Sequence, residues 1–221
     1  VKFLEFYYPE MIPHLTTSRS PQIHSGAAYK TWWAEKAGID PSKIVVVSIM
    51  PCTSKKYESE MEKLKFELKG LKLKPVDYVL TTREMATLLK KNQIDLPKLA
   101  DSEADSEGEY SGAAAIYGAS GGVMESALRS TARILTGQEL PKIDLEEVRG
   151  MKGIKRATIK IGDKEVKIAV VATARNARNV LEEIKKGKTD YDYIEFMACP
   201  GGCIGGGGQP LTSTNAIVKK R

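Results

Sequence analysis

A run rich in cysteine and glycine near the end of the chain has the residue types of a metal-cluster site. Cys199 and Cys203 stand four positions apart, and glycine occupies six of the eight positions in residues 201–208. Thiolate is a soft ligand that selects iron–sulfur clusters, Zn or Cu(I), and glycine lets backbone N–H groups approach cluster sulfurs closely. The third cysteine, Cys52, lies far upstream in residues 50–58. The sequence therefore predicts one site built from two distant segments.

The cysteine count leaves the kind of metal open. Three is an odd number, one short of the four ligands of a cubane, and settings rich in glycine and proline suit ligation better than disulfides. A C-x-x-x-C pair with one distant cysteine is equally consistent with an incomplete zinc site. The cysteines by themselves support both interpretations.

Two predicted strands lead into the cysteines. Residues 43–49 are short, β-branched and unbroken, a pattern typical of a strand buried on both faces of a parallel sheet. Cys52 follows just beyond the carboxyl end of this strand, where open α/β sheets bind ligands. Residues 193–197 are predicted as the last strand, which would bring Cys199 to the same edge as Cys52.

The remaining pattern predicts helices and hairpins around these strands. Val1 to Tyr8 looks like the end of a helix that begins upstream, and Thr81 or Thr82 begins a helix whose capping box is completed by Glu84. Further helices are predicted for residues 20–38, 122–135 and 174–186, a strand for 76–80, hairpins for 64–73 and 155–173, and a solvated loop for 101–109.

These elements fall into two groups, around residues 43–91 and 111–200. The predicted fold is α/β, with two lobes of mainly parallel sheets clasping one metal site. We expect the first lobe to comprise residues 1–110 and the second, with the Cys/Gly-rich run, residues 111–221.

Composition narrows the class of protein. The 34 basic and 28 acidic residues give a net charge of +6, but the basic residues are dispersed and no aromatic-interleaved patch indicates nucleic-acid binding. No apolar run approaches the roughly 18 residues of a membrane span, and the N-terminus lacks a signal-peptide pattern. We therefore predict a cytoplasmic protein that binds neither nucleic acid nor a membrane.

Two motifs together resemble the catalytic domain of iron-only ([FeFe]) hydrogenases. They are M-P-C-x-x-K-x-x-E at residues 50–58 and E-x-M-x-C-x-x-x-C-x-x-G-G-G-Q-P at residues 195–210. Further stretches fit the family in the same order: residues 19–22, 76–84, 108–112 and 117–125. The family's earlier motif T-S-C-C-P-x-W, with a fourth cubane ligand and a proton-delivering cysteine, is missing. We therefore expect this chain to be a fragment that begins just after that motif.

The resemblance implies a cofactor made of a 4Fe-4S cubane joined to a diiron unit that carries CO and CN⁻. Cys52, Cys199 and Cys203 align with cubane ligands, and Cys203 with the bridge to the diiron unit. Lys55 aligns with a lysine that donates a charge-assisted hydrogen bond to a cyanide ligand. Met50 and Met197, each two residues before a cysteine, align with thioethers packed around the diiron unit.

Other family positions also have counterparts here. Gln22 aligns with a polar pocket residue, Tyr117 stands where the family commonly has Phe, and Thr16 aligns with a hydroxyl of the proton relay. The backbone around the cofactor corresponds to Pro51, Gly118, Gly202 and Gly206. In the same motifs, Glu58 and Glu195 are interpreted as structural ties to backbone or lysine, and His14 and His24 match no ligand position.

The implied function is the reversible reduction of protons to H₂. The implied partners are protons, H₂, ferredoxin or an NADH-linked electron-transfer subunit, and maturation proteins. Three alternatives share the cysteines: a sensory protein with slow turnover, an iron–sulfur assembly factor without the diiron unit, and an electron-transfer module with a cubane alone. Met50, Lys55 and Met197 favour the hydrogenase over the assembly factor.

Overall fold

The computed structural model describes residues 1–103, 112–140, 153–211 and 214–220. The chain forms two compact units, residues 1–94 and 95–221, and each is described by itself. The predicted boundary between residues 110 and 111 falls in residues 104–111, outside the described part of the chain, together with most of the predicted loop at 101–109. That boundary stays a prediction.

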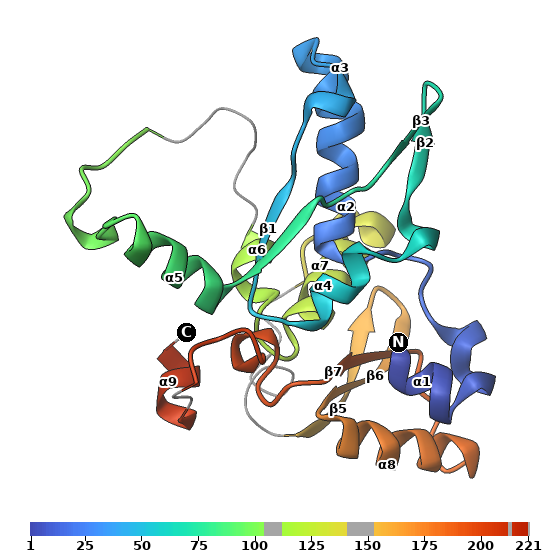
Figure 1. The fold of residues 1–221 in the computed structure, drawn as a ribbon. Coiled ribbons are helices and arrows are strands. Elements are labelled where there is room, and N and C mark those ends of the chain that lie inside the picture. Colours follow the sequence, from blue (N-terminus) through green and yellow to red (C-terminus); the bar gives the residue numbers. More distant parts are fainter. Residues whose placement is uncertain (104–111, 141–152, 212–213, 221) are drawn as a thin grey trace. The chain divides into compact units, whose positions relative to one another are not determined.

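The first unit contains a parallel pair of strands, β1 (Val47–Met50) and β4 (Tyr78–Thr81) (Figure 1). The prediction for residues 43–49 was wrong in its bounds and its burial, because β1 begins at Val47 and its residues alternate between solvent and core. Val47 and Ile49 are each 50% exposed, whereas Ser48 is buried and Met50 packs against the apolar core of this unit. A two-stranded sheet buries one of its faces here, so the side-chain period of two appears in the burial.

The predicted helix over residues 20–38 is confirmed, with an irregular middle. It comprises α2 (Pro21–Ala28), a π-helical turn η2 (Tyr29–Trp33) and α3 (Ala34–Ala37), and it ends at Gly38 with φ +66°. Inside the π-helical turn, Lys30 is buried and its ammonium lies 2.8 and 2.6 Å from the two carboxylate oxygens of Asp77. The same carboxylate accepts the backbone N–H of Val46 at 2.7 Å, so Asp77 joins this helix to the start of the sheet.

The hairpin and the capped helix of the first unit follow the predictions, but four short helical segments were not predicted. The capping box of α5 is confirmed, with Thr81 and Glu84 bonding each other's backbone N–H groups. A short helix, α4, which the sequence analysis did not predict, begins two residues after Cys52. The bounds are α1 (Lys2–Tyr7), η1 (Pro9–His14), η3 (Pro41–Lys43), α4 (Ser54–Ser59), η4 (Glu62–Leu64), the hairpin β2 (Phe66–Leu68) and β3 (Leu71–Leu73), and α5 (Thr82–Lys91).

The second unit is built on a three-stranded sheet in the order β5-β6-β7. β5 (Ile154–Ile161) and β6 (Lys164–Ala172) form the predicted antiparallel hairpin, and β7 (Tyr193–Met197) runs parallel to β6. The central strand β6 is buried from Ile168 to Ala172 because it has neighbours on both sides.

Helices cover this sheet through apolar side chains. Met124, Leu128 and Ala132 of α7 (Gly122–Thr136) belong to one core cluster with isoleucines of β5 and β6. Helix α8 (Ala174–Lys185) contacts β6 and buries Val180 and Leu181. The other helices among the described residues of this unit are η5 (Leu96–Lys98), α6 (Gly112–Ile116), η7 (Cys203–Gly205) and α9 (Asn215–Lys220).

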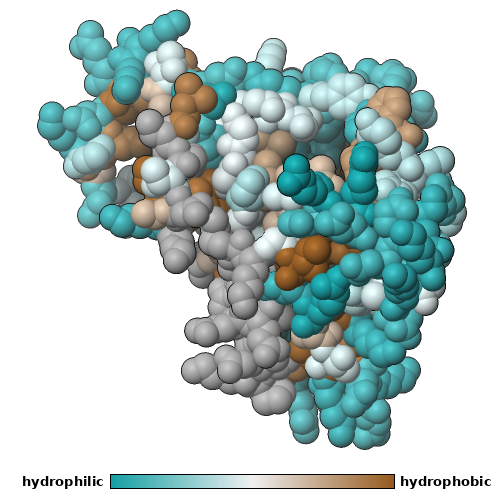
Figure 2. Space-filling model, turned by 90° about the horizontal axis from the view of Figure 1, so that it is seen from below, coloured by the Kyte–Doolittle hydropathy of each residue, from teal (hydrophilic) through white to brown (hydrophobic). Residues whose placement is uncertain are grey.

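The α/β class is confirmed, but the described sheets are not mainly parallel as predicted, because two of their strand pairs are parallel and two are antiparallel. The face drawn in Figure 2 is mostly hydrophilic, with hydrophobic groups in small separate patches. Across the described ranges, no helix is long and apolar enough to cross a membrane.

Candidate metal-cluster site

In the first unit, Cys52 stands between a strand and a short helix. β1 ends at Met50, the half-buried Cys52 follows two residues later, and α4 begins at Ser54. Cys52 thus lies just beyond the carboxyl end of a parallel strand, as predicted. Lys55 and Glu58 lie one turn apart on α4, and the Lys55 ammonium donates to the Glu58 carboxylate at 2.9 Å.

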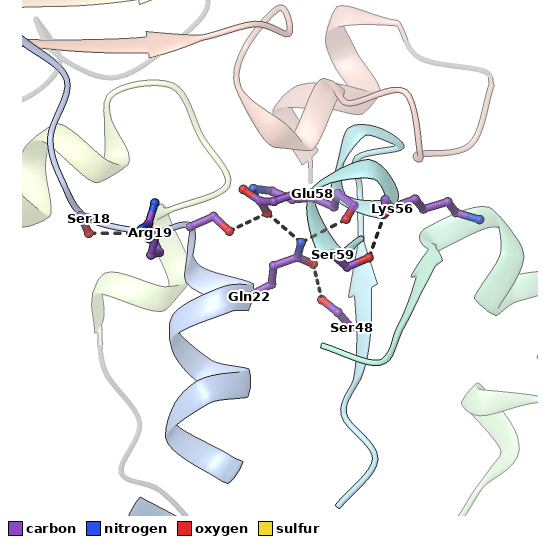
Figure 3. Close-up of polar contacts among 9 residues, drawn as sticks. Ser18, Arg19, Gln22, Ser48, Lys56, Glu58 and Ser59 are labelled. Atoms are coloured by element: carbon purple, nitrogen blue, oxygen red, sulfur yellow. Dashed lines mark hydrogen bonds and ion pairs between the residues drawn. The ribbon is translucent and has the colours of Figure 1, made fainter. Parts of the chain in front are cut away.

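Glu58 joins α4 to the start of α2 (Figure 3). Besides Lys55, its Oε2 accepts the Ser20 hydroxyl at 2.7 Å and the Gln22 amide at 2.8 Å. Burial raises the pKa of Glu58, but the hydrogen bonds from Lys55, Ser20 and Gln22 outweigh burial and hold its pKa below the ordinary value. The carboxylate therefore stays ionised at neutral pH and fixes the position of Lys55. The predicted role of Glu58 as a structural tie is confirmed.

Gln22 is buried, and its whole amide is used inside this network. Its Nε2 donates to Glu58 and, at 3.2 Å, to the backbone oxygen of Lys55, while its Oε1 accepts the Ser48 hydroxyl at 3.0 Å (Figure 3). One side chain therefore connects α2, α4 and β1 around the residues that follow Cys52. Its predicted contact with a cofactor stays a prediction.

The other candidates of the first unit occupy different settings. Met50 is half-buried against the core cluster of Ile23, Val76 and Val79, and Pro51 is half-buried next to Cys52. Thr16 is exposed, and its hydroxyl accepts the backbone N–H of Ser18 at 3.3 Å.

The two histidines have ordinary surroundings for loop and helix residues. His14 is exposed at the end of η1. His24, on α2, accepts the backbone N–H of Arg19 at 3.0 Å, and its Nε2 lies 3.1 Å from the Ser18 hydroxyl. That neither histidine is a ligand stays a prediction.

In the second unit, the cysteine pair lies on a tight loop that follows β7. Cys199 and Cys203 are half-buried, and Gly201 and Gly202 between them have φ of +73° and +99°. These backbone angles favour glycine strongly over other residues. None of the three cysteines forms a disulfide with another described residue.

A second loop, residues 118–121, holds the cysteine loop in place. The backbone N–H of Ser120 donates to the oxygen of Gly201 at 3.0 Å, and the N–H of Ile204 donates to the oxygen of Gly118 at 3.0 Å. The two backbones approach so closely that a Cβ on Gly202 would lie 2.5 Å from the Ser120 nitrogen. Gly118 and Gly202 therefore pack the two loops together.

Glu195 ties the same region to the sheet. Its carboxylate, on β7, accepts the backbone N–H of Gly121 at 2.6 Å and of Met124 at 2.8 Å, at the beginning of α7. Burial raises the pKa of Glu195 above its ordinary value, although the backbone donors act in the opposite direction. The predicted structural role of Glu195 is confirmed, and the positive end of α7 is occupied by a residue of the chain itself.

Three further candidates lie near these loops in the sequence. Tyr117 is half-buried, and its phenol oxygen lies 3.5 Å from the Ser126 hydroxyl on α7. Met197 is half-buried at the end of β7, and its backbone oxygen accepts the N–H of Thr173 at 2.7 Å. Gly206 is buried, and its N–H donates to the oxygen of Cys203 at 2.8 Å.

Sequence reasoning did not single out Ser120. Its side chain is 1% exposed, and its Oγ has no hydrogen-bond partner among the residues that the structure describes. Ser120 lies inside the motif of residues 117–125, and this position was the one sequence feature that could have indicated it. The sequence analysis considered only the glycines of that motif.

The second unit fits a sulfur-ligated cluster in its donor chemistry. Two soft thiols are presented on a glycine loop whose backbone leaves no room for a side chain at Gly202. Among the described residues, no three His, Cys, Asp or Glu side chains gather into a metal-binding group. Cys52 belongs to the first unit and the cysteine pair to the second. The prediction that Cys52 and Cys199 follow strands of one sheet edge was wrong, because β1 and β7 belong to different sheets.

Comparison with known proteins connects both cysteine motifs to one family. The family model described as iron only hydrogenase large subunit, C-terminal domain, matches residues 1–207. The chain is 47% identical over 211 residues to the periplasmic [Fe] hydrogenase large subunit of Nitratidesulfovibrio vulgaris. It is 46% identical over 223 residues to the NADP-reducing hydrogenase subunit HndD of Solidesulfovibrio fructosivorans. These matches cover 95% and 100% of this chain but 49% and 37% of the relatives, so the chain spans half of their length or less.

A second kind of relative is less similar. The chain is 35% identical over 206 residues to cytosolic iron-sulfur assembly component 3 of Pongo abelii, which covers 90% of this chain and 42% of that protein. Among solved structures, a variant of apo [FeFe]-hydrogenase HydA1 from Chlamydomonas reinhardtii matches with a TM-score of 0.82 and 36% identity, over 99% of this chain and 61% of that one.

Proposed function

This chain belongs to the iron-only hydrogenase family, whose model matches residues 1–207, and on that premise we propose that it is the central part of a hydrogenase catalytic domain. The parent protein would interconvert two protons and two electrons with H₂. The residue that carries this proposal is Lys55, which lies three positions after Cys52 and is held by Glu58.

Three cysteines of this chain would hold the cubane: Cys52, Cys199 and Cys203. The cofactor, when bound, would supply electrons from the cubane and an open iron position on the diiron unit. The residues that follow Cys52 and those around Cys203 are already fixed by Gln22, Glu58 and Gly118. A rigid surround helps a metal cluster because each ligand is positioned before the cluster binds.

Lys55 would orient the diiron unit through a cyanide ligand. Its ammonium has three N–H donors, and one of them is directed to Glu58. The others can donate to an anion, with Glu58 fixing the direction of the side chain. Met50 and Met197 would contribute thioethers to the surrounding wall, Gln22 and Tyr117 would line it, and Pro51, Gly202 and Gly206 would shape its backbone.

Thr16 would take part in proton transfer on the surface side of the path. It is exposed, and its hydroxyl can donate one proton while accepting another. This placement suits an entry point at solvent.

The electrons would come from ferredoxin or an NADH-linked subunit, and maturation proteins would insert the diiron unit. The relative named for NADP reduction supports a pyridine-nucleotide-linked partner. The cytoplasm is the proposed location. Fractionation of the native host would decide between that location and the periplasm named for another relative.

An iron–sulfur assembly factor is the second candidate function, and the similarity to cytosolic iron-sulfur assembly component 3 supports it. Such a protein would keep a cubane and have no diiron unit. The presence of Met50, Lys55 and Met197 favours the hydrogenase. A slow sensory hydrogenase would share all of these residues and would differ in its attached domains.

An infrared spectrum separates these functions. The parent protein is matured anaerobically with the diiron precursor after iron analysis has established the cubane. We expect bands of bound CO and CN⁻ that shift in Lys55→Ala. The matched control is Lys56→Ala, which removes a neighbouring ammonium paired with Glu84 at 2.6 Å, and its bands should equal those of the wild type.

Each other result points to a different function. A filled cubane without CO and CN⁻ bands would exclude the hydrogenase and support the assembly or electron-transfer role. Bands with turnover far below that of hydrogenases would support the sensory role.

A further inference from the structure

Ser120 is a buried hydroxyl with unused hydrogen-bonding capacity beside the cysteine loop. Its side chain is 1% exposed, and Oγ has no partner among the described residues. A buried hydroxyl without a partner is unfavourable, so native proteins usually satisfy such groups or use them. Helix capping does not explain it, because the backbone N–H groups of Gly121 and Met124 are taken by Glu195.

Several backbone groups around Ser120 are hydrogen-bonded. The N–H of Ser120 donates to Gly201 and the oxygen of Gly118 accepts from Ile204, both at 3.0 Å. The N–H of Ala119 donates to the oxygen of Ile116 at 3.1 Å. The Ser120 hydroxyl differs from these backbone groups because it has no partner among the described residues.

Ser120 lies beside the loop that carries the two cysteine sulfurs. Its nitrogen bonds the residue midway between Cys199 and Cys203, and lies 2.5 Å from where a Cβ on Gly202 would be. The residue is therefore in direct backbone contact with the segment that presents both thiols. Inorganic sulfide is an acceptor that the protein itself does not contain, and a cysteine sulfur accepts more strongly as the thiolate that binds a cluster.

We propose that the Ser120 hydroxyl donates a hydrogen bond to a sulfur of the cluster held by Cys199 and Cys203, and so raises the reduction potential of that cluster. The inference rests on the proposed cubane. Reduction adds an electron to the cluster, and a donor directed at sulfur stabilises the more negative, reduced form. Ser120 tunes the potential of the cluster and is not required for ligation.

The test measures the reduction potential of the cubane in the parent protein, reconstituted with iron and sulfide and without the diiron unit. A redox titration followed by electron paramagnetic resonance compares wild type with Ser120→Ala. We expect the equilibrium constant for reduction to fall roughly tenfold in the variant, which corresponds to a potential about 59 mV more negative. Ser120→Thr keeps a hydroxyl and should restore most of the difference.

The matched control is Thr189→Val, which removes another buried hydroxyl oxygen of the second unit that has no partner among the described residues. It lies outside the cysteine loop and should leave the potential unchanged. A second measurement uses the wild type in D₂O, where pulsed resonance should detect an exchangeable deuteron near the reduced cluster. Backbone N–H groups near the cluster exchange as well, so only the coupling of the Ser120 deuteron should be lost in Ser120→Ala.

The outcomes separate this inference from the proposed function. A Ser120→Ala protein with a full cubane, an unchanged potential and an unchanged deuteron signal would overturn the role of Ser120 alone. A wild-type parent protein that holds no cubane would overturn both proposals. A lower iron content or lower stability with an unchanged potential would show that Ser120 only packs the two loops.

Discussion

The carboxylate of Glu195 accepts the backbone N–H of Gly121 at 2.6 Å and joins the last strand of the second unit to the beginning of α7. Its other oxygen accepts the N–H of Met124 at 2.8 Å. Cys199 follows Glu195 by four residues, and Gly121 belongs to the loop that bonds the backbone around Cys203. Both ends of the cysteine loop are therefore connected, directly or through one loop, to a single carboxylate.

Glu195→Gln should destabilise the second unit. The amide can offer one oxygen to a backbone N–H, but its NH₂ group then faces the other N–H, and a buried donor loses its acceptor. We expect the free energy of unfolding of the parent protein to fall by about 1–3 kcal/mol, measured by urea denaturation. Glu165→Gln, an exposed carboxylate on β6, is the control and should change little. If both variants lost the same free energy of unfolding, the hydrogen bonds of Glu195 would not be the source of the stability.

Gly202→Ala should disrupt the cysteine loop. The residue has φ +99°, and the added Cβ would lie 2.5 Å from the Ser120 nitrogen. We expect backbone strain alone to lower the free energy of unfolding by about 1–3 kcal/mol. The parent protein should also bind less iron per chain after reconstitution. Gly112→Ala is the control, because a Cβ there meets nothing within 4 Å. If Gly202→Ala bound as much iron as the wild type, the cysteine loop could present both thiols without its close contact with Ser120.

The site could be predicted from the sequence where its signals are local. Cys52 follows a strand by two residues, and the tie between Glu58 and Lys55 joins residues three positions apart in one motif. The helices and hairpins were predicted from period, caps and turn residues for the same reason. Interactions between residues close in sequence depend on residue type and spacing, and both can be read from one sequence.

The remaining features depend on contacts between distant residues. Gln22 bonds Ser48 and Glu58, which lie 26 and 36 positions away, so no spacing reveals its three bonds. The apolar run at residues 43–49 could not show that only one face of the sheet would be buried. The short helix α4 has only six residues, too few to give a periodic signal. That the Ser120 hydroxyl has no partner among the described residues can be recognised only when its spatial neighbours are known.

Glu58→Gln should destabilise the first unit in a pH-dependent way. The pKa of Glu58 is held below its ordinary value, so the ionised group stabilises the folded state above the unfolded pKa of about 4.5, and that contribution is lost as pH falls through the folded pKa. We expect Glu58→Gln to cost about 1–3 kcal/mol near pH 7, and the difference from wild type to shrink as the pH falls below about 4.5.

The control for this prediction is Glu60→Gln. The Glu60 carboxylate pairs with Lys74 at 2.6 Å, but its side chain is 62% exposed, so its loss should cost no more than about 1 kcal/mol at neutral pH. Urea denaturation at several pH values measures both variants. A Glu58→Gln difference that is constant across this pH range would show that the ionised carboxylate is not the source of the stability.

Lys30→Met should be among the most damaging single changes in the first unit. The Lys30 side chain is 3% exposed and its ammonium bonds both oxygens of Asp77, whose carboxylate would lose its counter-ion in the variant. Removing one partner of a fully buried ion pair costs about 3–5 kcal/mol, and the 26% exposure of the Asp77 side chain makes this the upper bound of the loss that thermal or urea unfolding should detect. Lys43→Met, at an exposed position, is the control and should stay within about 0.5 kcal/mol of wild type. If Lys30→Met behaves like this control, the bond from Val46 N–H is sufficient to hold Asp77, and the π-helical turn does not depend on the ion pair for its stability.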